Sequence, residues 1–104
     1  MAIVHRRTFV GKAGAGGQLV QHIKEGHDTF KRFGLTVKTR VLSDYLSGRT
    51  DRVVAEWEAE GLADIENGMK AVMANPDAQK TVEGWFKKLT ELIDHAEVEN
   101  WTVE

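Results

Sequence analysis

The chain has 104 residues, a formal net charge of −2, and 29% charged residues of both signs beside 41% hydrophobic ones. This length fits one domain, because roughly 100–150 residues is the commonest domain size, and the mixed composition indicates a folded chain rather than a disordered one. The lack of cysteine excludes disulfides, thiolate nucleophiles and cysteine-ligated metal sites, and the charge balance lacks the basic excess typical of nucleic-acid binding.

Residues 3–10 are predicted to form a strand, because β-branched and aromatic types are frequent there. Alternation places His5, Arg7 and Phe9 on one face and the even-numbered positions on the other. Each face carries a cation, so the pattern alone does not decide which of the two faces points toward the helices. We expect the His5 face to point away from the helices, because Val4 and Val10 then lie beneath them.

The glycine-rich run 11–17 follows this strand and precedes a helix, which is the context of a phosphate-binding loop. A P-loop needs Lys and then Ser or Thr after its last glycine, and here Gly17 is followed by Gln18. A dinucleotide fingerprint starting at Gly14 would need Gly or Ala where Leu19 stands. We therefore interpret the run as a connector, with contact between backbone N–H groups and an anionic ligand as the alternative.

A helix ending near Gly34 is predicted after the connector. Its apolar stripe repeats at spacings of three and four and contains Leu19, Ile23, Gly26, Phe30 and Phe33. A glycine inside a helix costs about 1 kcal/mol relative to alanine. We therefore expect Gly26 to let the helix approach the sheet closely.

The middle of the chain is predicted to form a hairpin with its charges on one face. Strand character runs from residue 35 to about residue 42 and returns over 53–58, with turn-forming residues at 43–51. Lys38 and Arg40 alternate with apolar or small residues in the first strand, and Glu56 and Glu58 do so in the second. Opposite charges facing each other across such a ladder contribute roughly 0.2–1 kcal/mol per pair.

Two helices and a strand complete the chain. Positions 62, 65, 69 and 72 repeat at helical spacing, and Asn75-Pro76 ends that helix and starts another, with Asn75 as its N-cap. The last helix is expected to direct six apolar residues toward a core: Ala78, Val82, Trp85, Phe86, Leu89 and Ile93. The alternation over 97–102 predicts a closing strand.

This order predicts an α+β, ferredoxin-like split βαβ fold, in which helices cover one face of an antiparallel sheet. The bare face would carry Lys38, Arg40, Glu56 and Glu58, with Trp101 and other apolar side chains between them. Such a face is too apolar to leave in water and too charged for a dry core. We therefore expect a second copy of the chain to cover it, as a homodimer that buries roughly 1,600 Å².

Two segments of the chain resemble a known family. Arg7-Thr8-Phe9, followed by Gly14 and an amphipathic helix, resembles the Arg-Thr-Tyr strand and Pro-Gly turn that open NIPSNAP-like domains, with Phe9 in place of the tyrosine. Residues 57–64 and the later Asn75-Pro76 resemble the strand-to-helix passage and Asp-Pro break of the same domains. NIPSNAP-like domains belong to the dimeric α+β barrel superfamily, together with the antibiotic-biosynthesis monooxygenases.

The resemblance implies that residues 1–104 form a single dimeric α+β barrel domain, in which two subunits pack their sheets together. It also implies that small organic ligands are held between sheet and helices or inside the barrel. Several members of the superfamily oxidise quinols without a cofactor, and others bind or degrade haem. Fold alone does not select among these activities.

Two hypotheses for function follow. The first is a homodimeric barrel that binds a small organic ligand, with candidate contacts at Phe9, Lys38, Glu56, Glu58 and Trp101. The second is a cofactor-independent monooxygenase that acts on a quinol or a polyketide-like aromatic, with His5 as the base and Arg7 or Arg40 stabilising the developing oxyanion. The first hypothesis needs only the fold and a pocket, whereas the second requires a cavity that joins His5, Arg7 and Arg40.

Five aromatic residues at helical or strand spacing are predicted to belong to the core: Phe30, Phe33, Trp57, Trp85 and Phe86. Contact of one or two of them with a flat ligand is the alternative, because pockets in such barrels are lined by aromatic side chains. Spacing alone does not separate these two interpretations.

No cofactor, no metal and no membrane or nucleic-acid partner is expected. His22 and His27 are five residues apart, which turns them ~140° from each other on a helix, and His5 and His95 lack a matched carboxylate motif. A haem-binding relative would need one of the four histidines as its axial ligand. No apolar run approaches the ~20 residues that span a bilayer and no secretory signal is recognisable, so a cytoplasmic location is expected.

Overall fold

The computed structural model describes residues 1–44 and 50–104, so part of the predicted turn at 43–51 lies outside the described residues. The described elements follow the predicted order: β1 (Ile3–Gly11), α1 (Gly16–Arg32), β2 (Lys38–Ser43), β3 (Arg52–Ala59), α2 (Leu62–Met73), α3 (Pro76–Leu92) and β4 (Ile93–Thr102). The strands form one antiparallel sheet in the order β2-β3-β1-β4. The predicted α+β, ferredoxin-like fold is confirmed.

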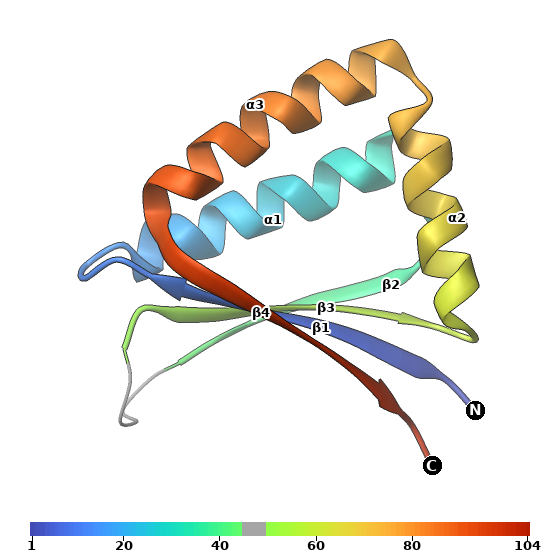
Figure 1. The fold of residues 1–104 in the computed structure, drawn as a ribbon, viewed down its shortest axis with the longest axis horizontal. Helices are drawn as coiled ribbons and strands as arrows, with labels where there is room; N and C mark the ends of the chain where they lie inside the picture. Colours follow the sequence, from blue (N-terminus) through green and yellow to red (C-terminus); the bar gives the residue numbers. More distant parts are fainter. Residues whose placement is uncertain (45–49) are drawn as a thin grey trace.

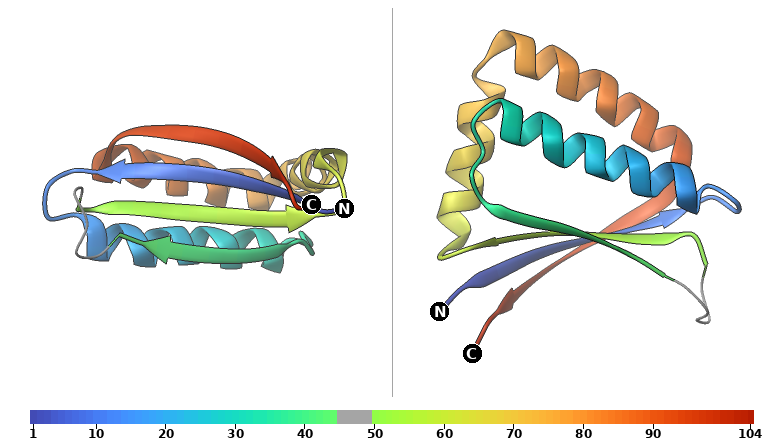
Figure 2. Two further views of the ribbon diagram at one scale, coloured as in Figure 1. Left: turned by 90° about the horizontal axis from the view of Figure 1, so that it is seen from below. Right: turned by 180° about the vertical axis from the view of Figure 1, so that it is seen from behind.

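The helices lie on one side of the sheet. α1 and α3 run side by side over the strands, and α2 stands at one end of this layer (Figure 1). Seen from the other side, the strands have no described helix in front of them (Figure 2, left). We call the helix-covered side of the sheet the inner face and the other side the outer face. No helix within residues 1–44 and 50–104 is long and apolar enough to cross a membrane.

Register and burial assign each strand position to a face. Phe9 on β1 pairs with Val53 on β3, and both are buried in one cluster with side chains from α1 and α3. Because side chains alternate along a strand, His5 and Arg7 share this inner face with Phe9. The expectation that His5 and Arg7 lie on the bare face is therefore wrong.

The cross-strand partners explain this correction. The inner face of β3 offers Val53, Ala55 and Trp57 to the helices, whereas its outer face carries charged residues, Glu56 among them. β1 must match the face of the strand beside it, because paired residues share a face. The apolar residues on the inner face of β3 therefore decide the orientation of β1, and Val4 and Val10 of β1 itself do not.

The core has two parts along the inner face. The first contains Phe9, Leu19, Ile23, Val53, Leu89 and Leu92, and the second contains Phe30, Leu35, Val72, Ala78 and Val82. Burial of each large apolar side chain contributes about 1.5–3 kcal/mol relative to leaving it in water. The two parts hold the helices against the sheet.

α1 begins on a carboxylate supplied by a residue far along the chain. The side chain of Asp51 accepts hydrogen bonds from the backbone N–H groups of Gly14 at 3.0 Å and Gly16 at 2.9 Å. These bonds lower the pKa of Asp51. The carboxylate of Asp51 thus accepts from backbone N–H groups of the run that was considered for binding an anionic ligand.

Gly26 makes room for a helix rather than for the sheet. A Cβ atom at Gly26 would lie 2.6 Å from the indole of Trp85 on α3. That indole donates from Nε1 to the carbonyl oxygen of His22 at 2.7 Å, and His22 donates from Nε2 to the carbonyl oxygen of Trp85 at 2.8 Å. The expected role of Gly26 against the sheet is therefore wrong, because its neighbour is the indole.

The last helix begins as predicted but ends earlier. Asn75 caps α3, with Oδ1 accepting from the backbone N–H of Asp77 at 2.9 Å and of Ala78 at 3.3 Å. Ile93 is already extended, with φ −120° and ψ 154°, so it starts β4 and its predicted place on the helix is wrong. Phe86 is 43% exposed rather than directed into the core.

Candidate functional site

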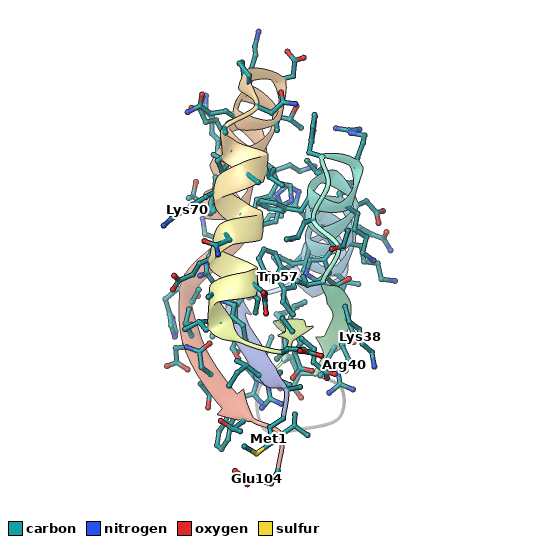
Figure 3. All side chains as sticks on the ribbon, turned by 90° about the vertical axis from the view of Figure 1, so that its right-hand side faces the viewer. Met1, Lys38, Arg40, Trp57, Lys70 and Glu104 are labelled. Carbon is teal, nitrogen blue, oxygen red and sulfur yellow. The ribbon has the colours of Figure 1, made fainter. Side chains whose placement is uncertain are left out.

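A pocket opens between the inner face of the sheet and the helices. Its empty space, open mouth included, is about 540 Å³. In Figure 3, Trp57 lies between the strands and the helices, while Lys38 and Arg40 lie beside β2 and away from the helices. We call this space the inner pocket, and its lining residues are His5, Arg7, Phe9, Ile23, Gly26, His27, Phe30, Ala55, Trp57, Met69, Trp85 and Phe86.

Trp57 is the centre of the aromatic wall. The edge of one ring meets the face of the other between Phe30 and Trp57, with centroids 5.5 Å apart. The ring centroid of Trp57 lies 6.0 Å from that of the His27 imidazole and 6.3 Å from that of the His5 imidazole. Of the five aromatic residues predicted for the core, all but Phe33 line the inner pocket, so core and pocket share the same side chains.

Arg7 brings a positive charge into this apolar surrounding. It lies on β1 between His5 and Phe9 on the inner face, and it is partly buried. Burial lowers the pKa of the Arg7 guanidinium, which nevertheless stays protonated, as arginine does throughout proteins. Within residues 1–44 and 50–104, no carboxylate or other acceptor pairs with it.

His27 is a pocket residue that the sequence reasoning missed. Its side chain is buried in the wall formed by α1, and burial, assisted by the charge of Lys31 and opposed by that of Asp28, lowers its pKa to about 4. The ring is therefore neutral at pH 7. A signal was present in the sequence, because His27 lies four residues after Ile23 and three before Phe30, on the apolar stripe of the helix.

His5 is held at the sheet end of the inner pocket by β4. Its Nδ1 lies 2.7 Å from the side-chain oxygen of Asn100. An amide oxygen only accepts, so Nδ1 donates, and Nε2 of a neutral ring is left as an acceptor. A group that accepts a proton and a group that stabilises negative charge, His5 and Arg7, thus line one pocket.

The other candidate residues lie on the outer face. Glu56 is only 3% exposed. Its two carboxylate oxygens accept hydrogen bonds from Nε of Arg40 at 2.5 Å and from Nε of Arg6 at 2.6 Å. Burial raises the pKa of Glu56, but hydrogen bonds and charge from Arg40 and Arg6 outweigh it and leave the pKa lowered. Lys38 pairs in register with Glu58, as predicted for the hairpin.

The candidate set therefore divides between two faces of the sheet. His5, Arg7 and Phe9 line the inner pocket, whereas Lys38, Arg40, Glu56, Glu58 and Trp101 lie on the outer face. The expected grouping of Arg40 with His5 and Arg7 is wrong, because the sheet separates them. Arg40 instead holds Glu56.

The histidines do not form a metal site in the described part of the chain. His95 pairs with Val10 and lies on the outer face, while His5 pairs with Asn100 and lies on the inner face. No group of three His, Cys, Asp or Glu side chains suited to a metal ion occurs among the described residues. His22 instead joins α1 to α3 through Trp85.

Comparison with known proteins gives structural relatives only. No protein-family model matches the chain, and no curated protein matches it by sequence. A NIPSNAP domain protein of Burkholderia xenovorans, itself uncharacterised, has a TM-score of 0.76 at 16% identity, over 98% of this chain and 94% of that one. A NIPSNAP family protein of Agrobacterium tumefaciens has a TM-score of 0.76 at 15% identity, over 100% and 94% of the two chains.

An oxygenase has the same fold. SnoaB of Streptomyces nogalater, described as a cofactor-independent oxygenase, has a TM-score of 0.67 at 15% identity, over 98% of this chain and 92% of its own. At such identities the likeness shows the fold alone. The fold expected from the resemblance to NIPSNAP-like domains is thus confirmed.

Proposed function

We propose that this chain, which has the fold of the dimeric α+β barrel superfamily, forms a homodimer and binds a small, flat organic molecule in the inner pocket. The observation that carries the proposal is an aromatic pocket holding an unpaired cation. Ligand sites are typically concave spaces lined by apolar and aromatic side chains with a few polar groups. The inner pocket has this character, because aromatic and apolar side chains line it together with His5, Arg7 and His27.

The cation argues against a purely structural role for the inner pocket. Moving a charge out of water without a partner costs free energy, and a buried charge is ordinarily paired. Arg7 lies among Phe9, Ala55 and Trp57 with no partner in the described residues. A core selected for stability alone would have an apolar residue at this position, so we attribute Arg7 to ligand binding.

The outer face supports the homodimer. Leu42 is 41% exposed and Trp101 is 53% exposed, and the charges beside them differ in sign across the sheet. Lys38 and Arg40 lie on β2, at one edge, whereas Glu97 and Glu99 lie on the same face of β4, at the other edge.

A two-fold axis parallel to the strands would lay β2 of one copy over β4 of the other. In that arrangement the basic edge of each sheet faces the acidic edge of its partner, and the exposed apolar side chains are covered. A solved structure from Bacteroides fragilis with a TM-score of 0.67 to this chain is described as a dimeric protein of ferredoxin-like fold.

Intrinsic fluorescence tests ligand binding, because Trp57 and Trp85 both line the inner pocket. Titration with 2-naphthol, a flat neutral probe, should quench the emission saturably. Ala55→Leu, which fills the pocket from the sheet, should weaken binding by about tenfold or more, equivalent to ~1.4 kcal/mol. Ala71→Leu makes the same change on the exposed side of α2 and should leave binding unaltered. Equal binding by both variants would place the probe elsewhere.

A cofactor-independent oxygenase is the alternative function, favoured by the fold shared with SnoaB and by His5 and Arg7 lining one pocket. In this alternative His5 accepts a proton from the substrate and Arg7 stabilises the resulting oxyanion. When the substrate is a polyketide-like aromatic with an activated CH₂ group, such as an anthrone, O₂ oxidises that carbon. One oxygen atom enters the product as a carbonyl, and the other leaves with both hydrogens as water.

Oxygen uptake with an anthrone substrate tests this alternative. His5→Ala should abolish any uptake catalysed by the protein, and His95→Ala, which changes an outer-face histidine, should not affect it. Uptake that survives at the full rate in His5→Ala would remove His5 as the base.

A further inference from the structure

We infer that Arg7 binds a negatively charged oxygen group of the ligand, so that the inner pocket takes a flat organic monoanion such as an aromatic carboxylate or an enolate. This inference rests on the ligand pocket proposed above and adds the charge and orientation of what enters it. Neither the fold nor its relatives assign a charge to the ligand.

The surroundings of Arg7 leave its guanidinium available to a ligand. Its register partners are Ala55 on β3 and Val98 on β4, neither of which has a polar side chain. Ala55 also lines the pocket, and its small side chain leaves space beside the guanidinium. Arg7 thus contributes a cation to a wall that is otherwise apolar at this point.

The neighbouring arginine provides an internal comparison. Arg6 is the next residue back along β1, points to the outer face, and donates to Glu56 at 2.6 Å. The chain therefore supplies a carboxylate to the arginine on one face. Arg7 lacks any such partner among the described residues, and no Asp or Glu lines the inner pocket. The missing counter-charge is the feature that an anionic ligand would supply.

Two other polar side chains, His5 and His27, line the inner pocket. His27 is neutral at pH 7 because burial lowers its pKa to about 4. Arg7 is the one lysine or arginine among the described lining residues, so it is the permanent positive charge that a single negative charge of the ligand would balance. Hydrogen bonds between a guanidinium and a carboxylate are short and strong, and the planar fork can engage both oxygens.

The aromatic wall sets the expected shape. Trp57, Phe30 and Phe9 line the same pocket as Arg7, and such ring surfaces favour a flat apolar body. Phe86 lines the same pocket while 43% exposed, which marks the side where the pocket opens. The ligand would thus enter with its charged group toward β1 and its ring between sheet and helices.

A matched pair of probes tests the inference. 2-Naphthoate and 2-naphthamide have nearly the same shape but differ in charge at pH 7, and calorimetric titration measures the affinity of each. The wild-type chain should bind the naphthoate at least about tenfold more tightly than the naphthamide. Equal affinities for the two probes would overturn the inference while leaving the ligand pocket in place. Binding of neither probe would overturn both the pocket and the inference.

Substitution assigns the preference to Arg7. Arg7→Met should bind the naphthamide as the wild type does and lose the preference for the naphthoate, whereas Arg7→Lys should keep part of it. Arg32→Met removes an exposed arginine from the end of α1 and should leave the preference intact. A preference that persists in Arg7→Met would overturn the assignment. The comparison of probes on the wild type decides the charge of the ligand even if Arg7→Met does not fold.

Discussion

Two adjacent arginines in β1 differ in whether they have a partner within the described residues. Arg6 lies on the outer face and shares Glu56 with Arg40, whereas Arg7 lies on the inner face with no partner in the described residues. The difference arises because successive side chains of a strand point to opposite faces. Arg6 therefore meets a carboxylate on the outer face, whereas Arg7 meets the aromatic pocket on the inner face. Arg6 therefore contributes to stability, and Arg7 is available for binding.

Removing the charge of Glu56 tests its structural role. Glu56→Gln keeps the size of the side chain but weakens its bonds to Arg6 and Arg40, and it should lower the free energy of unfolding by about 1.5–3 kcal/mol in urea denaturation. Glu58→Gln changes a less buried carboxylate on the same face and should stay within about 0.5 kcal/mol of wild type. Equal losses in both variants would contradict a specific role for Glu56.

The candidate site was only partly predictable from the sequence. Phe9, Arg7 and His5 were identified because they alternate along one strand, but their face depended on β3, which alternation within β1 does not report. His27 was missed because a histidine in an apolar stripe was considered only as a metal ligand. Its burial depends on Trp57, a residue 30 positions away in the chain that packs beside it.

At the level of elements, two glycines in helices have opposite consequences. Gly26 faces the indole of Trp85, and a Cβ there would lie 2.6 Å from the ring, which a hydrogen bond from its Nε1 to the carbonyl oxygen of His22 holds in place. Gly84 lies within α3 and has no atom within 4 Å of where a Cβ would be. A methyl group added at Gly26 would therefore clash with the indole, whereas a methyl group added at Gly84 would lie in open space.

Alanine at these two positions separates the effects. Gly84→Ala should stabilise the protein by about 0.5–1 kcal/mol, because alanine favours the helix. Gly26→Ala gains the same propensity but displaces the indole, so it should destabilise the protein by about 1–2 kcal/mol. Urea unfolding monitored by circular dichroism measures both. A stabilised Gly26→Ala variant would mean that the contact between α1 and α3 relaxes easily.

The start of α1 should depend on pH through Asp51. Hydrogen bonds from Gly14 and Gly16 hold the pKa of this carboxyl below its ordinary value of 3.8, so its stabilising effect is present above that pH and is lost as the pH falls through the folded-state pKa. Asp51→Asn keeps a side chain that tolerates the left-handed backbone, φ 62°, but removes the charge. The variant should be less stable than wild type at pH 7, and urea unfolding should show this difference shrinking near pH 3.

The elements themselves were more predictable than their junctions. The order of strands and helices followed from local periodicity, and the start of α3 followed from Asn75 and Pro76, which act within one turn. The end of α3 carries no glycine or proline, and Ile93 continues the apolar spacing of the helix while already belonging to β4. Pairing with β1, a long-range contact, decides where that strand begins.

For the whole molecule, the main open surface is the outer face of the sheet, which no described helix covers (Figure 2). Its apolar residues, among them Leu42 and Trp101, lie between a basic edge at β2 and an acidic edge at β4. A second copy of the chain offers the complementary arrangement, since rotation about an axis parallel to the strands exchanges the edges. Trp101 lies on the acidic edge strand and would be covered by the partner.

Trp101→Lys should therefore shift the chain from dimer to monomer, because it removes a large apolar contact and places a positive charge opposite the basic edge of the partner's sheet. Sedimentation equilibrium at micromolar concentration measures the mass of both forms. Leu62→Lys makes a similar change at an exposed apolar residue of α2, on the helix side, and should remain dimeric. A monomeric wild type would remove the homodimer. A dimeric Trp101→Lys would move the interface away from the outer face, because like charges of the two copies would otherwise face each other there.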